Sequence, residues 1–178
     1  MMKNVKRIFL ATVLMGVLML KTVYANVPDW TQLPGHHNES VLLTAEENES
    51  YDEIQDAARG LRLSTAMLRI INEQNGNLYI SVDTLTHTFV DKIYETVFLD
   101  VWDDSKEDWV QIGKWDFERS KEEVENEELS TFYVGFTVSG CELNRYYRAR
   151  AMHLVQWGDD MEGKATETNG VLLTDHEV

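Results

Sequence analysis

Apolar and polar residues alternate with a period of two along most of the chain from about residue 61 onward. Such alternation is typical of strands with one buried face. Seven segments show it: residues 67–73, 78–85, 91–102, 109–117, 129–138, 145–157 and 165–173. With no helical segment among them, they predict an all-β fold, a single immunoglobulin- or fibronectin-III-like antiparallel sandwich over residues 61–174. A small β-barrel is the alternative.

The penultimate predicted strand indicates which side chains enter the core. Its alternation turns Tyr147, Ala149 and Ala151 inward. Sandwiches often place a tyrosine near the start of this strand, with its hydroxyl bonded to the backbone a few residues upstream. The two small alanines predict room for Trp109 or Trp115 from the opposite sheet. We therefore expect structural roles for these aromatic residues.

The first 25 residues have the pattern of a signal peptide. A basic start is followed by an apolar run from Ile8 to Leu20, and Val23 and Ala25 occupy the −3 and −1 positions of a cleavage site. A helix of this run would be roughly 20 Å long, short of the ~30 Å hydrocarbon core of a bilayer. We expect cleavage between Ala25 and Asn26, and a secreted product without a stable membrane anchor.

Residues 26–60 lack a sustained hydrophobic period. They are rich in acids and contain both prolines of the chain. Such a segment is typical of an extended, self-repelling linker. We predict an acidic and mostly disordered linker, with at most a frayed helix over residues 46–58, and a short tail at residues 175–178.

The net charge narrows the function classes. The 178 residues hold 16 Lys and Arg, 31 Asp and Glu, and carry a charge of −15. The predicted leader contains four of the bases and no acid, so the remaining chain would hold 12 bases and 31 acids, a charge of −19. This acidity argues against nucleic acid as a partner, because phosphate contacts need clustered Lys and Arg.

The one cysteine, Cys141, excludes a disulfide within the chain. In an oxidising exterior it could instead join two copies as a disulfide dimer. A Cys141–His153 catalytic dyad is conceivable, but a free thiol is the simpler interpretation. No other nucleophile motif is present, so we predict no catalytic residue.

No segment predicts a metal or cofactor. The acidic hairpin at residues 103–108 begins like a calcium loop, but Asp108 stands where the sixth position needs glycine, and Lys114 where the twelfth needs glutamate. The adjacent pair His36 and His37 has no further ligand at a suitable spacing.

The outward side chains of the penultimate strand form the best candidate binding surface. Tyr146, Arg148 and Arg150 would share this face, where planar groups could stack on a sugar or hold an acidic peptide. The alternative that we favour is a ladder in which both arginines pair with acids on neighbouring strands.

Two segments carry distinctive motifs. The first runs from Val90 to Trp115 and contains Trp-x₅-Trp. The second carries Tyr-Tyr-Arg-x-Arg-x-x-His from Tyr146, followed by Thr-x-Gly at residues 168–170. Together they resemble a family of small exported proteins of Gram-positive, clostridium-like bacteria whose function is uncharacterised. The resemblance implies export and one β-rich domain, but no activity. The acidic loop at residues 118–128 departs from the family pattern.

These observations favour an exported, non-enzymatic interaction module at or outside the cell envelope. Its partner would be an extracellular protein or a glycan. One alternative is a secreted hydrolase that uses Asp and Glu; two convergent carboxyls with raised pKa in a concave pocket would favour it. Another is an envelope or sporulation-associated structural protein without a small ligand.

Overall fold

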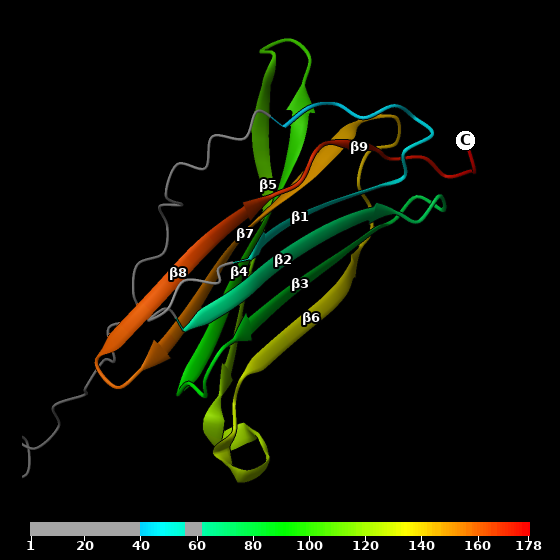
Figure 1. Ribbon diagram of the computed structural model, residues 1–178. Helices are drawn as coiled ribbons and strands as arrows, with labels where there is room; N and C mark the ends of the chain where they lie inside the picture. The colour runs from blue at the N-terminus through cyan, green and yellow to red at the C-terminus, as the bar shows by residue number, and fades with distance from the viewer. Residues whose placement is uncertain (1–39, 56–61) are drawn as a thin grey trace, which may run out of the picture. The chain divides into compact units, whose positions relative to one another are not determined.

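The computed structural model describes residues 40–55 and 62–178, whose strands form two antiparallel sheets (Figure 1). One sheet has the order β1-β2-β3-β6, and the other has the order β5-β4-β7-β8, with β9 also paired to β7. The strands are β1 (Glu49–Gln55), β2 (Leu63–Asn72), β3 (Leu78–Thr86), β4 (Lys92–Asp103), β5 (Asp108–Ser120), β6 (Thr131–Val138), β7 (Tyr146–Trp157), β8 (Asp160–Glu167) and β9 (Val171–Leu172). The predicted leader and His36-His37 lie outside the described residues.

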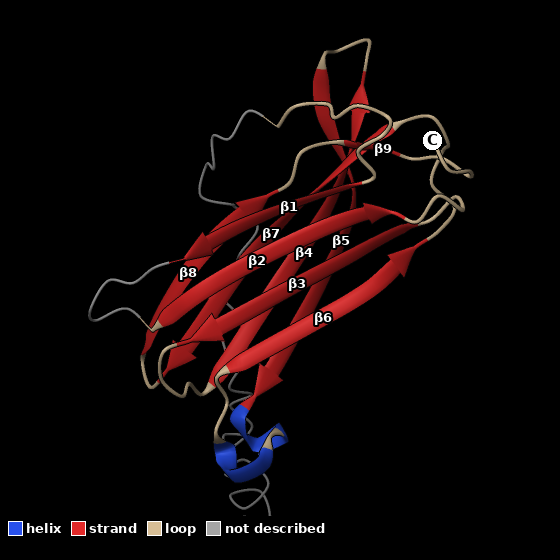
Figure 2. Cartoon of the chain, turned by 45° about the vertical axis from the view of Figure 1, so that its right-hand side comes forward, coloured by secondary structure: helices blue, strands red, loops and turns tan. Residues whose placement is uncertain are grey.

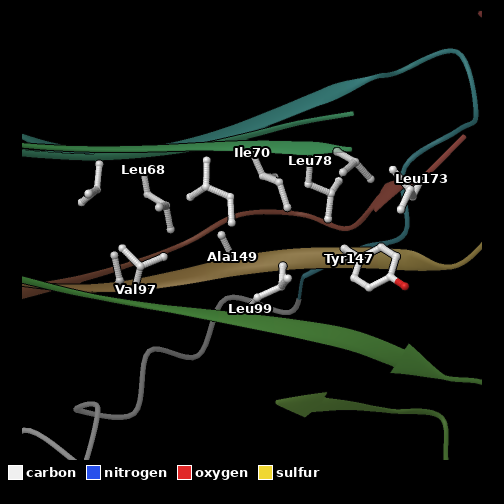
Figure 3. Close-up of a cluster of buried hydrophobic side chains, with 12 residues drawn as sticks. Leu68, Ile70, Leu78, Val97, Leu99, Tyr147, Ala149 and Leu173 are labelled. Atoms are coloured by element: carbon white, nitrogen blue, oxygen red, sulfur yellow. The ribbon is translucent and has the colours of Figure 1, made fainter. Parts of the chain in front are cut away.

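The two sheets pack face to face, which confirms the predicted all-β sandwich. Inward side chains of β2 and β3, among them Leu68 and Ile70, meet Val97 and Leu99 of β4 across the interface (Figure 3). All four are buried. Burial of a leucine-sized side chain contributes about 1.5–3 kcal/mol relative to exposure, so this interface is the main source of stability.

Tyr147 confirms the expected inward side of β7. Its ring is buried together with Ala149 and Ala151, and its hydroxyl donates to the backbone carbonyl of Glu142 at 2.9 Å. Burial raises the pKa of Tyr147 to about 12, so the hydroxyl keeps its proton and remains a donor. The bond ties the start of β7 to the turn before it.

The predicted linker and frayed helix are wrong for the described residues, because residues 49–55 form β1. This strand pairs with β2 from Glu49↔Ile71 to Gln55↔Thr65. Its inward side chains include Ser50 and Asp52, which accept the backbone N–H groups of Asn169 and Glu167, each at 2.9 Å. The sandwich therefore begins before residue 61, and the strand was missed because its inward positions are polar.

The last predicted strand, residues 165–173, is wrong in its bounds, because it consists of parts of β8 and β9. Between them Thr168 interrupts the regular ladder along β7. Its hydroxyl accepts the N–H of Ala149 at 3.0 Å, in place of a backbone carbonyl, and its own N–H donates to the Ala149 carbonyl. The hydrophobic pattern does not predict that a side-chain hydroxyl takes the place of a backbone carbonyl in the ladder.

The expected placement of Trp109 and Trp115 is also wrong, because β5 contains a bulge. Leu99 pairs with Gly113 and Asp100 with Gln111, so Ile112 is left over and the strand changes faces there. Trp115 therefore points inward from the same sheet as β7, with its ring 5.0 Å from Phe136 of the opposite sheet. Trp109 lies on the outer face, 5.3 Å from Trp102.

Candidate functional site

The predicted surface on β7 is occupied by ion pairs within the chain. Arg148 Nε lies 3.0 Å from Asp100 Oδ2, and Arg150 reaches both oxygens of the same carboxylate at 2.7 and 2.9 Å. Arg148 also donates to Glu167 at 2.7 Å and to Ser40 Oγ at 2.9 Å. The side chain of Asp100 is only 2% exposed, so this is a largely buried cluster.

The ring faces near these arginines are used as well. The Arg148 guanidinium lies 4.7 Å from the ring centre of Trp109, and that of Arg150 lies 5.2 Å from Phe98. Such stacking leaves the planar groups little surface for a ligand. Arg148 and Arg150 thus form a ladder of ion pairs with acids on neighbouring strands. Tyr146, at the start of the same strand, pairs with Leu172 of β9. The structure gives no support to a binding role for Tyr146, Arg148 and Arg150.

A second polar cluster lies between the sheets and joins them. Thr84 Oγ1 of β3 donates to Glu95 Oε1 of β4 at 2.7 Å and lies 2.9 Å from Nδ1 of His153 on β7. The other ring nitrogen, Nε2, lies 2.9 Å from Thr166 Oγ1 of β8. Each ring nitrogen of His153 thus has a threonine hydroxyl as its partner, and a hydroxyl can donate or accept the hydrogen bond.

Burial holds both ionisable groups of this cluster neutral near pH 7. It raises the pKa of Glu95 to about 8 and lowers the pKa of His153 to about 3. Glu95 Oε2 has no hydrogen-bond partner. Because the four residues are fully buried or 1% exposed, no substrate reaches them, and their role is to position the sheets. Both His153 nitrogens are engaged, so His153 does not form the conceivable dyad with Cys141.

Cys141 packs at the margin of the core and is partly buried. Burial raises the pKa of its thiol, which lowers the fraction of reactive thiolate. The acidic hairpin is likewise engaged within itself: Asp103 accepts from Lys106 Nζ at 2.7 Å and from Ser105 Oγ at 2.6 Å. Over residues 40–55 and 62–178, no three His, Cys, Asp or Glu side chains gather closely enough to hold a metal ion.

A hollow of about 360 Å³ lies on the outer face of the four-stranded sheet. Figure 2 shows these four strands in front of the five-stranded sheet. The pairing register places one transverse row of side chains in the order Tyr51, Arg69, Ser81 and Gly135. Ser81 is small, so the surface is depressed between the larger side chains around it. Pockets that bind small ligands are typically about 300–1,000 Å³.

The tyrosines of β3 and β6 fix one side of this hollow. Tyr79 Oη and Tyr133 Oη form a hydrogen bond of 2.7 Å. The pair closes over Gly135, where a β-carbon would overlap Tyr79 Oη and lie 2.8 Å from Tyr133 Oη. Tyr133 nevertheless remains 58% exposed, and Tyr51 on β1 is 71% exposed. Two rings thus stand open to solvent on opposite strands of the sheet.

The acidic side chains that line the hollow differ in their partners. Glu49 pairs with Arg69, and Asp52 accepts the N–H of Glu167. Burial raises the pKa of Asp83, although hydrogen bonds from Thr131 and the backbone of Thr84 lower it. The net shift in the pKa of Asp83 is upward, because burial outweighs these hydrogen bonds.

Sequence reasoning did not identify this hollow. Tyr79, Ser81 and Asp83 alternate along one predicted strand, and Tyr133 and Gly135 along another, so their shared outward face was a usable signal. The contribution of Tyr51 has no such signal, because residues 49–55 lack the apolar alternation that predicts a strand.

The chain matches no protein-family model, and no curated protein is significantly similar to it. In the part of the chain that the structure describes, no helix has the length and apolar character needed to cross a bilayer.

Proposed function

We propose that this protein is an exported, non-enzymatic binding module of the immunoglobulin type, which holds its ligand in the hollow on the outer face of β1-β2-β3-β6. The strand order supports the type: β2-β3-β6 matches strands A-B-E of an immunoglobulin sandwich, and β5-β4-β7-β8 matches C′-C-F-G. The Tyr147 bond to Glu142 matches the tyrosine corner at the start of strand F. β1 is then an extra strand beside A.

The hollow is the observation that carries the binding role. Its walls and floor belong to paired strands, so the ligand groups are held in place before binding, which reduces the entropy lost on association. Exposed tyrosines are enriched in recognition surfaces because they present a large ring and a polar hydroxyl at low conformational cost. The ion pairs on the other sheet leave Tyr146, Arg148 and Arg150 out of this role.

A hydrolase receives less support from the same geometry. A glycosidase needs two carboxyls facing each other across the substrate, one of them with a raised pKa. Asp83 has the raised pKa, but Glu49 is bound to Arg69 and Asp52 to the Glu167 backbone. No second carboxyl of the hollow is available as its partner, so binding without reaction is the function that we propose.

Filling the hollow should abolish binding without disturbing the core. Ser81→Trp places an indole in the depression, while Ser81 itself points away from the sheet interface. We expect the wild-type protein to sediment with insoluble envelope material from the producing cells, and the variant to stay in the supernatant. Ser139→Trp is the matched control, because Ser139 is exposed outside the hollow. Equal sedimentation of wild type and Ser81→Trp, with unchanged circular dichroism, would overturn the proposed function.

Export is a separate part of the proposal and has its own test. The protein recovered from culture medium should begin at Asn26, because the leader is removed after Ala25. Mass spectrometry of the intact protein measures this directly. Full-length protein retained inside the cell would contradict the secreted localisation. A disulfide dimer through Cys141 stays part of the proposal for the oxidising exterior.

A further inference from the structure

We propose that the ligand of the hollow is a neutral oligosaccharide, which stacks on Tyr51 and Tyr133 and forms hydrogen bonds with Arg69, Ser81 and Asp83. This inference rests on the proposed binding function and specifies its ligand. Tyrosine, serine, arginine and carboxylate groups are found together in the hollow.

The separation of the two open rings excludes a compact cation. Tyr51 lies on β1 and Tyr133 on β6, three strand spacings apart. Neighbouring strands are about 4.8 Å apart, so the two strands are separated by about 14 Å. An aromatic cage needs the cation within about 6 Å of each ring centre. Two platforms this far apart instead suit an elongated ligand that touches both, with its middle over the floor.

The platforms and the floor between them match the chemistry of a sugar chain. A pyranose ring has an apolar face of C–H groups that packs on the negative face of an aromatic ring. Its hydroxyl groups both donate and accept hydrogen bonds. The floor offers donors on Arg69, an acceptor on Asp83, and both functions on Ser81. An alkyl or purely aromatic ligand would bury the Ser81 hydroxyl and the remaining hydrogen-bonding positions of Arg69 and Asp83 without partners, at a cost of about 1–3 kcal/mol for each group left unsatisfied.

The charge of the hollow favours a neutral ligand over an anionic one. The outward carboxyls of Glu49 and Asp83 outnumber the single cation, Arg69, which is already paired with Glu49. A uronic acid or phosphate would therefore meet net repulsion. The chain as a whole has a charge of −15, which adds to this repulsion.

An extended peptide fits the face less well. Peptides that add to sheets bind through backbone groups at an edge strand. β2 and β3 lie inside the sheet and have a paired strand on each side, so their backbone groups are used. A peptide over the hollow would have to rely on side chains alone.

Isothermal titration with defined hexasaccharides tests the inference. The neutral probes are the β-1,4-linked hexamers of glucose, xylose, mannose and N-acetylglucosamine, and the α-1,4-linked hexamer of glucose. The charged probes are hexagalacturonate and tetramethylammonium chloride. We expect at least one neutral probe to bind the purified protein, and Tyr51→Ala and Tyr133→Ala each to weaken that binding about tenfold through loss of stacking. Phe89→Ala is the matched control, because Phe89 is a 54% exposed ring outside the hollow.

Three results would overturn this ligand assignment: no neutral probe binds, a charged probe binds in preference, or the tyrosine variants bind as tightly as wild type. The Ser81→Trp sedimentation test separates the two proposals. If Ser81→Trp loses envelope binding while no neutral probe binds the wild type, the ligand class is wrong and the binding module stands. If Ser81→Trp sediments like the wild type, both proposals fall.

Discussion

Asp100→Asn should lower the free energy of unfolding by about 3 kcal/mol, because it leaves two largely buried arginines without their shared anion. Asp100 is 2% exposed, and it accepts three hydrogen bonds from Arg148 and Arg150. Arg148 retains Glu167 as a partner, whereas Arg150 keeps only a 3.2 Å bond to Gln111. The amide preserves the size of the side chain, so the loss reports charge rather than packing. Urea unfolding at pH 7 measures it.

Glu118→Gln is the matched control for this experiment. Glu118 pairs with Lys92 on the neighbouring strand, but both side chains are well exposed, at 47% and 39%. Exposed ion pairs contribute about 0–1 kcal/mol, so this variant should unfold close to wild type. A loss for Asp100→Asn as small as that of Glu118→Gln would show that the arginine cluster contributes little to stability.

Glu95 should make the free energy of unfolding fall as the pH rises. Its pKa is about 8 in the folded protein against an ordinary value of 4.5. Between these values the unfolded carboxyl loses its proton while the folded one retains it, so stability falls as pH rises through this range. Relative to Glu95→Gln, which does not titrate, the wild type should lose about 5 kcal/mol across the range. Because only the changes in stability with pH are compared, any pH-independent effect of the Glu95→Gln substitution on the free energy of unfolding cancels.

His153 acts in the opposite direction. Its pKa is about 3 when folded against an ordinary 6.5, so its contribution is lost as pH falls from 6.5 toward 3. The two slopes cancel between pH 4.5 and 6.5. From pH 6.5 to 8 only Glu95 acts, and wild-type stability should fall by about 2 kcal/mol.

Urea unfolding at pH 5, 6.5 and 8 measures the contributions of Glu95 and His153 to the free energy of unfolding. Glu95→Gln should gain stability from pH 5 to 6.5 and show no fall from this site above it. Glu118→Gln should keep the wild-type profile, because its carboxylate is exposed. The same fall from pH 6.5 to 8 in wild type and Glu95→Gln would place the cause in another group.

The β-sandwich was predictable because most of its strands have apolar inward positions that alternate with polar outward ones. β1 was not, since Ser50 and Asp52 replace apolar residues and find their hydrogen-bond partners more than 100 residues away. Local hydropathy contains no trace of such partners. The backbone N–H groups of Glu167 and Asn169, which donate those bonds, come beside β1 only when the two sheets pack together.

The side-chain faces were predictable up to the bulge at Ile112. Arg148 and Arg150 point outward as expected, but the carboxylate that pairs with both lies in β4 and reaches them only through the register of the strands. The hollow depends on register across four strands, and β1, one of the four, lacks the apolar alternation that predicts a strand. Alternation within a strand can be counted in a sequence, whereas register between strands cannot.

The links from residues 40–52 to residues 167–169 bear on the order in which the chain can fold. Ser40, Ser50 and Asp52 are made more than 100 residues before Glu167 and Asn169, with which they bond. Pairings of such long sequence separation form slowly, and these can form only after residues 167–169 have been made. The early part of a nascent chain therefore lacks its final partners. For a protein that we propose to be exported, this delay would keep the polypeptide unfolded enough to be threaded across a membrane before the sandwich closes.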